Sequence, residues 1–359
     1  MRADVPVGLY LSGGVDSTIV LHYLSEAGIT PRCFAIGFGE PGFDETEWAK
    51  RAASHYGATL TTTYVDNPGL DEVGEILDYF DEPFYDSSAV PTAMLNKTAA
   101  EDVKVVLGGD GGDEVFFGYK RYIYTFYLYR VLQQVPAPLR RSLLAIVRRL
   151  GGSRTKHNKF LRNALLDPVE ALFLNSHDIG GGELIRDADT AGRAHAMAFE
   201  HYSRAFDAGF DPAGIFRGDV DNYLSCDILM KADRCSMMNS IEQRAPLLDS
   251  DLIRFAAELP LVTKLQRGEG KSVLKKVLAR ELGNGFAYRK KSGFRFPLKR
   301  FAVENEAEIR ETIRTGLQDM PFDASKLLRR GFSDYRLVDL ERMWKLFALG
   351  RFLCNQRSG

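Results

Sequence analysis

Residues 5–28 read VPVGLYLSGGVDSTIVLHYLSEAG, an apolar run joined to an amphipathic run through a short glycine-rich turn. The apolar run at residues 5–11 predicts a buried strand. Ile19, Val20 and Leu24 then share one face of a predicted helix over residues 17–27, which Gly28 ends. A strand that leads into a helix through a tight turn is the repeating unit of α/β proteins.

The same alternation continues through the first 120 residues. Further strands are predicted at residues 32–38, 58–65 and 103–107, with helices at 47–57, 70–80 and 90–102. Asp44 and Glu47 have the spacing of a capping box, which predicts the start of the first of these helices. Strands that alternate with helices predict an α/β fold with a parallel, doubly wound sheet.

The chain changes character after residue 121. Residues 122–225 show helical periodicity without a convincing strand, and residues 226–281 predict long helices with short turns. Residues 283–299 are rich in glycine and lysine and predict a loop, and the remainder is again helical. We therefore divide the chain into an α/β core at 1–121, a helical insertion at 122–225 and a helical C-terminal part at 226–359, within one compact unit.

Composition argues against several classes of protein. The 47 basic and 48 acidic residues give a formal net charge of -1, so we expect neither nucleic acid nor a membrane as a partner. The basic, amphipathic residues 140–150 are interpreted as a solvated helix face. The opening residues lack the apolar core of a signal peptide. Four cysteines without a C-x-x-C pair are typical of reduced thiols in a cytoplasmic protein.

The turn S-G-G-V-D-S at residues 12–17 has the chemistry of an anion site. Gly13 and Gly14 allow backbone N–H groups to approach an anion, and the start of the following helix adds its own N–H groups. The turn lacks the lysine of a Walker A loop, so no such lysine holds a γ-phosphate. Asp16 within an anion-binding turn indicates that a cation lies between the carboxylate and the anion.

A second polar loop, G-G-D-G-G-D-E at residues 108–114, begins where the fourth predicted strand ends. The carboxyl ends of parallel strands are where such sheets bind ligands, so we expect this loop near the first one. Three carboxylates close together repel one another unless a metal or a cationic substrate offsets their charge. The two loops together predict a ligand site at one edge of the sheet.

The first loop resembles the pyrophosphate loop of the N-type ATP pyrophosphatases (PP-loop, adenine nucleotide alpha hydrolase-like proteins). Further segments, listed here, resemble motifs of the synthetase domain of glutamine-hydrolysing asparagine synthetases, in the order of that family: GGDGGDEVFFGY (108–119), DEPFYDSS (81–88), KADRCSM and IEQRAPLLD (231–249), KSVLKK (271–276) and RKKSGF (289–294). The last 60 residues carry no motif that resembles the family.

The resemblance implies a site for ATP and Mg²⁺. It implies a nucleotide-binding role for the residues Leu11, Ser12, Gly13, Gly14, Asp16, Ser17, Ile36, Gly108, Gly109 and Lys271. Asp16 and Asp113 would hold the metal, since hard carboxylate ligands suit magnesium. Asp110, Glu114 and Lys291 would be catalytic, with Asp110 facing the acceptor. We interpret Glu242 and Arg244 as a structural ion pair.

Two residues depart from the family pattern. Asp110 stands where many asparagine synthetases have Glu, which weakens the assignment of aspartate as the acceptor more than it weakens adenylation. Phe117 stands where the family usually has Gly, which could alter the wall of the pocket.

The resemblance implies amide formation through an acyl-adenylate, with aspartate and ammonia giving asparagine, AMP and pyrophosphate. Other acceptors stay open: the chain could resemble a β-lactam synthetase, a peptide macrocyclase or an enzyme that amidates sugar acids. A catalytically silent subunit that docks a glutaminase is the alternative from another class. Arg2 stands where family members begin with a glutaminase domain and its nucleophilic cysteine. We therefore expect free ammonia as the donor, a stand-alone or excised synthetase, and a separate glutaminase domain or subunit as a candidate partner. A homodimer is also left open.

Overall fold

The computed structural model describes residues 3–38, 45–65, 68–132, 134–150, 166–176, 185–290 and 296–358. Five parallel strands form one sheet in the order β3-β2-β1-β4-β5. The strands are β1 (Val7–Tyr10), β2 (Arg32–Phe38), β3 (Thr59–Val65), β4 (Val105–Leu107) and β5 (Glu242–Arg244). In the central register Leu9 of β1 lies between Cys33 of β2 and Leu107 of β4. Strands β2 and β3 therefore lie on one side of β1, and strands β4 and β5 lie on its other side.

Helices cover both faces of this sheet, as the alternation of strands and helices predicts. One face packs against α1 (Val15–Glu26), α2 (Thr46–His55) and α15 (Ser272–Leu282). The other face packs against α4 (Ala89–Ala99). Within β2, Cys33 and Ala35 point to the first face and Phe34 and Ile36 to the second, as the period of two along a strand requires.

The predicted strands and helices of the core are confirmed to within a few residues. The N-cap of one helix differs from the predicted residue. Asp44 lies outside the described residues, and the N-cap of α2 is Glu45. The two helices after β3 are α3 (Leu70–Asp78) and α4. A short α5 (Gly112–Val115) follows β4 and carries the end of the second polar loop.

The prediction that residues 226–281 contain only helices and turns is wrong. Residues 242–244 form β5, which pairs with β4 from Val105↔Glu242 to Leu107↔Arg244. Its sequence is Glu-Gln-Arg, so it has no apolar alternation, and only its pairing to a buried strand makes it extended. The predicted loop at 283–299 also contains a helical turn, α16 (Asn284–Ala287).

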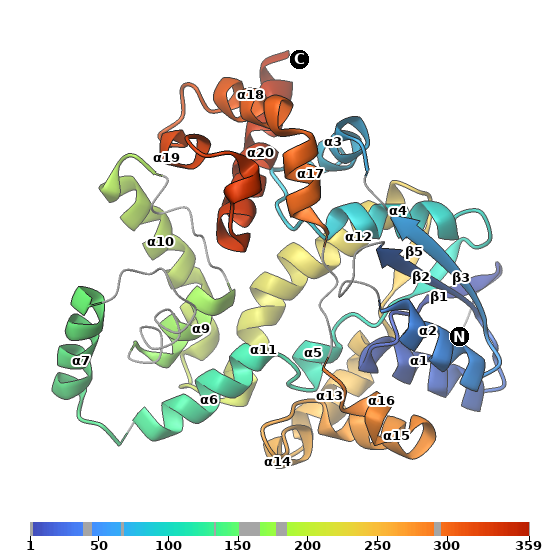
Figure 1. Ribbon diagram of the computed structural model, residues 1–359. Coiled ribbons are helices and arrows are strands. Elements are labelled where there is room, and N and C mark those ends of the chain that lie inside the picture. The colour runs from blue at the N-terminus through green and yellow to red at the C-terminus, as the bar shows by residue number, and fades with distance from the viewer. Residues whose placement is uncertain are drawn as a thin grey trace.

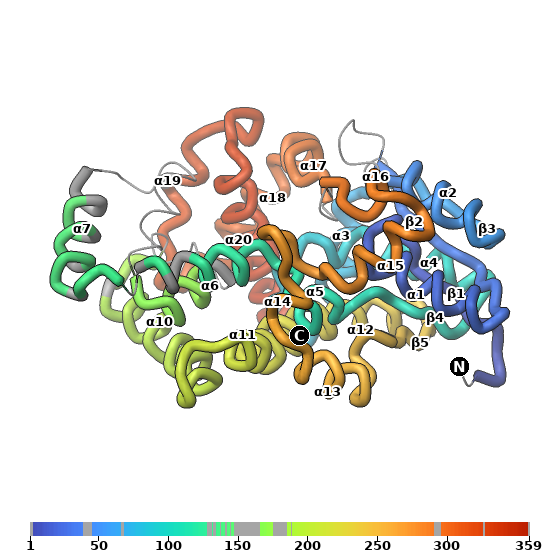
Figure 2. Tube along the Cα trace, turned by 90° about the horizontal axis from the view of Figure 1, so that it is seen from below, coloured from blue at the N-terminus to red at the C-terminus, as the bar shows by residue number. Residues whose placement is uncertain are grey.

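The rest of the chain is helical. The helices of the middle part are α6 (Lys120–Leu132), α7 (Ala137–Leu150), α9 (Pro168–Ser176), α10 (Ala188–Ser203) and α11 (Pro212–Asp219), followed by the π-helix η2 (Val220–Leu229). The later helices are α12 (Met230–Met237), α13 (Ser250–Glu258), α14 (Leu261–Lys264), α17 (Leu298–Glu304), α18 (Glu306–Gly316), α19 (Ser325–Leu328) and α20 (Leu337–Ser358). Short 3-10 turns are η1 (Arg204–Phe206), η3 (Pro246–Leu248) and η4 (Phe332–Asp334). In both views α7 lies at the end of the molecule far from the sheet (Figures 1 and 2).

None of the helices in these ranges combines the length and the apolar character that a membrane crossing needs. Among the cysteines, Cys33 and Cys235 are buried and Cys226 is exposed.

The C-terminal helices form a second apolar core beside the sheet. α20 packs against α18, α17 and α3 (Figure 1). The buried rings of Phe301, Trp344 and Phe347 belong to this core. The crossing of α18 and α20 is made by two glycines. A Cβ atom at Gly316 would overlap the carbonyl oxygen of Gly350, and one at Gly350 would lie 2.8 Å from the carbonyl oxygen of Thr312. The two helix backbones are therefore in direct contact.

We expect Gly316→Ala to destabilise the protein by about 2 kcal/mol or more, because the new methyl must push two packed helices apart. The control is Gly192→Ala in α10, where an added Cβ meets no atom of the described residues within 4 Å. That change should stabilise by about 0.5–1 kcal/mol through helix propensity. Urea unfolding of the two variants measures both effects. Equal stability of the two variants would contradict the close crossing.

Candidate functional site

The loop between β1 and α1 is shaped by hydrogen bonds that its own serines form. Ser12 Oγ lies 3.1 Å from Ser17 Oγ and accepts a hydrogen bond from the backbone N–H of Gly14 at 3.2 Å. Gly13 has φ +67°, and a Cβ there would lie 2.6 Å from the backbone of α2, so only glycine fits. Gly14 is the N-cap of α1, and no side chain in the described ranges caps that helix. The N–H groups of the first helical turn therefore remain available to an anion.

The loop after β4 lies beside it, because β4 and β1 are neighbours in the sheet. Asp110 Oδ2 in this loop accepts a hydrogen bond from Gln243 Nε2 of β5 at 2.8 Å. Burial raises the pKa of Asp110, although nearby Lys231 and the bond from Gln243 lower it in part. The Glu114 carboxylate in α5 accepts a hydrogen bond from the Tyr119 hydroxyl at 2.8 Å. Burial raises the pKa of Glu114 to about 7.

Lys271 joins the two loops. Its Nζ atom lies 2.6 Å from Asp16 Oδ2 and 2.7 Å from Asp113 Oδ1, and its side chain is 9% exposed. Burial lowers the pKa of Lys271, but the two carboxylates more than offset this and hold the pKa above its usual value. Lys271 itself has φ +56°, a conformation that is rare outside glycine and that its buried contacts must hold in place.

The two carboxylates have the chemistry of a magnesium site. Asp16 Oδ1 is buried and has no hydrogen-bond partner among the described residues. Over the described ranges no group of three or more His, Cys, Asp or Glu side chains could hold a metal ion. Magnesium in proteins is commonly bound by one or two carboxylates together with substrate phosphates and waters. Asp16 and Asp113 fit that role, and a site closed by protein ligands alone does not.

Both loops open onto one cavity of about 480 Å³. Ten of the predicted site residues line it: Leu11, Ser12, Asp16, Ser17, Ile36, Gly108, Gly109, Asp110, Asp113 and Glu114. Gly13, Gly14 and Lys271 are not among the lining residues, but Lys271 forms ion pairs with Asp16 and Asp113, which are. Lys291 lies outside the described residues. The crevice is at the switch point of the sheet, between β1 and β4, where open α/β sheets bind ligands.

Several lining residues were not assigned a role from the sequence. Asp86, Ser88, Tyr223, Lys231 and Gln243 line the same cavity. They come from the start of α4, from η2, from α12 and from β5, which are distant in the chain. Asp86 and Lys231 are in quoted motifs, but the motifs alone did not indicate that the two form an ion pair.

Arg289 brings the glycine- and lysine-rich segment to the first loop. Its Nη2 donates to the carbonyl oxygen of Gly13 at 2.8 Å, and its guanidinium lies over the ring of Trp48 and 3.4 Å from Glu45. The segment that contains Lys291 therefore starts beside the anion-binding turn.

The predicted ion pair of β5 is present. Arg244 Nε lies 2.6 Å from Glu242 Oε1, and the side chains are 37% and 58% exposed, respectively. Between them Gln243 points to the cavity. Glu242 and Arg244 therefore lie on either side of Gln243, which is the residue of β5 that reaches the cavity.

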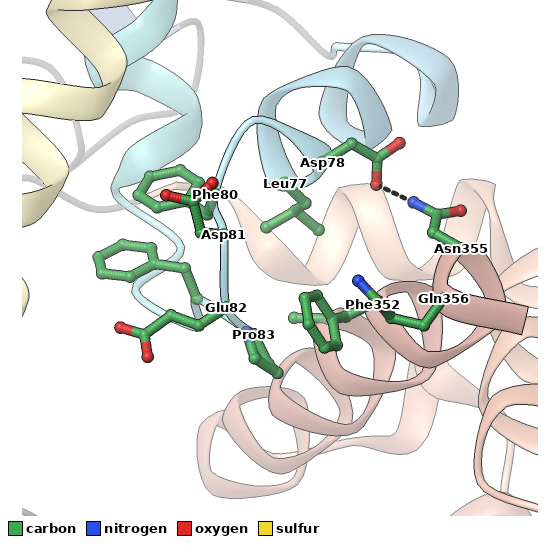
Figure 3. Close-up of a pocket in the computed structure, with 11 residues that line it drawn as sticks. Leu77, Asp78, Phe80, Asp81, Glu82, Pro83, Phe352, Asn355 and Gln356 are labelled. Carbon is green, nitrogen blue, oxygen red and sulfur yellow. Dashed lines mark hydrogen bonds between the residues drawn. The ribbon is translucent and has the colours of Figure 1, made fainter. Parts of the chain in front are cut away.

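A second cavity of about 270 Å³ lies between residues 77–84 and α20 (Figure 3). Asn355 closes one side, where its Nδ2 donates to Asp78 Oδ1 at 2.7 Å. The motif DEPFYDSS is thus shared between two cavities. Asp81 to Phe84 line the second, whereas Asp86 and Ser88 line the first.

Phe117 adopts φ +60°, and its side chain is buried against Tyr122 and Phe126. A left-handed backbone is the conformation that glycine accepts at little cost. Phe117 therefore has a strained backbone conformation, and its ring gains aromatic contacts in the helical part of the molecule.

The fold and these loops define an α/β protein with an anion-binding turn at the switch point of its parallel sheet. A family model described as asparagine synthase matches residues 1–349. The chain belongs to the asparagine synthase family.

Curated relatives agree with this assignment. The chain is 33% identical to a putative glutamine-hydrolyzing asparagine synthetase of Mycobacterium tuberculosis, over 85% of this chain and 47% of the relative. It is 28% identical to asparagine synthetase 1 (glutamine-hydrolyzing) of Bacillus subtilis, over 90% and 51%. It is also 25% identical to the amidase chyE of Penicillium rubens, over 78% and 47%. The chain spans about half the length of these curated relatives.

We expect Phe117→Gly to be more stable than Phe117→Ala by about 1 kcal/mol, because both lose the same ring but only glycine relieves the left-handed backbone. The control is exposed Phe255 in α13, where glycine should instead be about 1 kcal/mol less stable than alanine. Chemical unfolding of the four variants measures both differences. The same sign at both positions would contradict the strain at Phe117.

Proposed function

We propose that this chain activates a carboxylate as its adenylate and joins it to ammonia, with aspartate and asparagine as acceptor and product. The carboxylate attacks the α-phosphorus of ATP and releases pyrophosphate. Ammonia then attacks the activated carbonyl carbon and releases AMP. The family and its asparagine synthetase relatives support ATP-dependent amidation of this kind.

One observation carries the proposal. The serine–glycine turn after β1 and the carboxylate-rich loop after β4 open onto the same cavity of about 480 Å³. An anion held at the first loop therefore lies next to the carboxylates of the second. That is the arrangement that a metal-bound polyphosphate requires.

The chain's residues then take the following roles. The leaving pyrophosphate is bound by Ser12, Gly13, Gly14 and Ser17. The nucleotide is contacted by Leu11, Ile36, Gly108 and Gly109. The acceptor lies against Asp110 and Glu114. Asp16 and Asp113 hold magnesium, which supplies positive charge to the phosphates when it is bound. Lys271 fixes both carboxylates and offers its cation to phosphate oxygens. Lys291 offsets charge on the adenylate as it forms and decays.

We further propose that the ammonia comes from a glutaminase, as a domain or as a separate subunit. The names of the bacterial relatives include glutamine hydrolysis, and this chain spans about half their length. A second candidate reaction keeps the same chemistry but uses another acceptor, since an amidase is among the relatives.

We expect ATP to be cleaved between its α- and β-phosphates. Incubation of the purified chain with ATP, magnesium, ammonium and a panel of carboxylates should give AMP and pyrophosphate, with aspartate converted to asparagine. Chromatography and mass spectrometry identify the products. ADP and orthophosphate would exclude adenylation, and AMP formed only with another carboxylate would replace aspartate as the acceptor.

Asp16 and Asp113 should act as a unit. Asp16→Asn and Asp113→Asn should each reduce turnover roughly 100-fold or more, the scale of losing a preorganised electrostatic contact, and the double variant should be little worse. Steady-state pyrophosphate release measures this. The control is Asp207→Asn, because Asp207 is exposed and is far from both aspartates in the sequence. This change should leave the rate unchanged. Losses that multiply in the double variant would mean that the two residues act independently.

A further inference from the structure

The helix α7 turns apolar side chains to the solvent. Leu139, Leu143 and Ile146 are 53%, 39% and 50% exposed. They are spaced by four and three positions, so they share one face of the helix. None of the three belongs to an apolar core among the described residues. The interpretation of residues 140–150 as a solvated helix face does not account for this apolar side.

The charge of α7 has a single sign. Its sequence APLRRSLLAIVRRL contains four arginines and no acidic residue. The longer segment at 115–150 contains seven lysines and arginines, again without Asp or Glu. The expectation that no membrane is a partner rests on the total charge of -1, which combines this basic segment with an acidic remainder. Positive charge that is concentrated in one segment indicates an anionic partner.

The arginines border the apolar face in the helical pattern. Successive positions of an α-helix are about 100° apart, which puts Arg140 and Arg149 at the two edges of the apolar face. Arg141 and Arg148 fall on the opposite side. A helix that is apolar on one side and rich in arginine elsewhere is typical of segments that lie in the interface of a membrane. An arginine at the edge of such a face can keep its apolar stem beside the acyl chains while its guanidinium group reaches lipid phosphates.

The chemistry of this face favours a lipid surface over other partners. A nucleic acid is bound through basic and aromatic side chains, and it leaves an aliphatic face in water. A second copy of the chain that paired α7 with α7 would bring arginines together, and like charges at an interface repel. An anionic membrane offers both an apolar interior and negative charge. The place of α7 at one end of the molecule, far from the sheet, is also one that a flat surface can reach (Figures 1 and 2).

We propose that α7 binds the surface of a membrane that contains anionic phospholipids. Leu139, Leu143 and Ile146 enter the boundary between head groups and acyl chains, and the arginines of the helix bind lipid phosphates. The binding is peripheral, since no helix in the described ranges is long and apolar enough to cross a membrane. α7 contributes no lining residue to the cavity of about 480 Å³, so the inference is independent of the proposed reaction.

The test is cosedimentation of the full chain with vesicles. One set contains phosphatidylglycerol and phosphatidylcholine in equal parts, and the other contains phosphatidylcholine alone. Wild type should bind the anionic vesicles roughly 10- to 100-fold more tightly, because each arginine near an anionic surface adds several-fold to the affinity. This preference should fall when the salt concentration is raised, since salt screens charges at the surface.

Two double variants separate the apolar from the charged contribution. Leu139→Gln with Ile146→Gln should weaken binding to anionic vesicles roughly 10-fold or more, the scale of withdrawing a buried aliphatic side chain. Arg140→Gln with Arg141→Gln should weaken it about 10-fold and leave binding to neutral vesicles nearly unchanged. Because Leu139 and Ile146 are exposed, thermal unfolding should find the first variant as stable as wild type.

The matched control is Phe255→Gln with Val262→Gln, which changes two exposed apolar residues of α13 and α14. It should bind both kinds of vesicle as wild type does.

Equal binding of wild type to the two kinds of vesicle, or an equal loss in the control and in Leu139→Gln with Ile146→Gln, would overturn the proposal. Binding of an RNA oligonucleotide in place of the anionic vesicles would assign α7 to a nucleic acid instead. A wild-type dimer that is lost in Leu139→Gln with Ile146→Gln, without vesicle binding, would assign this face to a second copy of the chain.

Discussion

The buried cation of Lys271 holds the site together. It lies within 2.7 Å of both Asp16 and Asp113, and so connects the start of α15 to the loops after β1 and β4. Two carboxylates and one lysine leave one negative charge in a largely buried place. Buried charges are costly unless they are paired, and removing one partner of such a group is strongly destabilising. The same residual charge gives the pair of carboxylates an affinity for a further cation.

The sequence predicted the α/β core well because its signals are local. The apolar strand of residues 5–11, the glycines of the first turn and the helix after them are contiguous, so their order is sufficient to predict them. The anion-binding turn and the carboxylate-rich loop could be placed together because neighbouring parallel strands end at the same edge. Ten of the predicted residues accordingly line one cavity.

Features that depend on distant contacts could not be predicted in the same way. β5 is a strand of three polar residues, and only its pairing with β4 makes it one. The ion pair of Asp86 with Lys231 joins α12 to the start of α4, and no spacing in the sequence shows it. The π-helix η2 is also a rare form of helix that the helical periodicity of the sequence does not distinguish. The ion pairs of Lys271 with Asp16 and Asp113 likewise join residues far apart in the chain, and no spacing in the sequence shows them.

The position of β5 also constrains the order of assembly during synthesis. β1 to β4 are all made before residue 108, but the edge beside β4 stays unpaired until residues 242–244 have left the ribosome. Pairing of strands far apart in sequence is slow, and an unpaired strand edge is prone to pair with other chains. Gln243 can donate to Asp110 only when this edge is closed, so the turn after β1 can form early in synthesis, whereas the contact between Gln243 and Asp110 forms late.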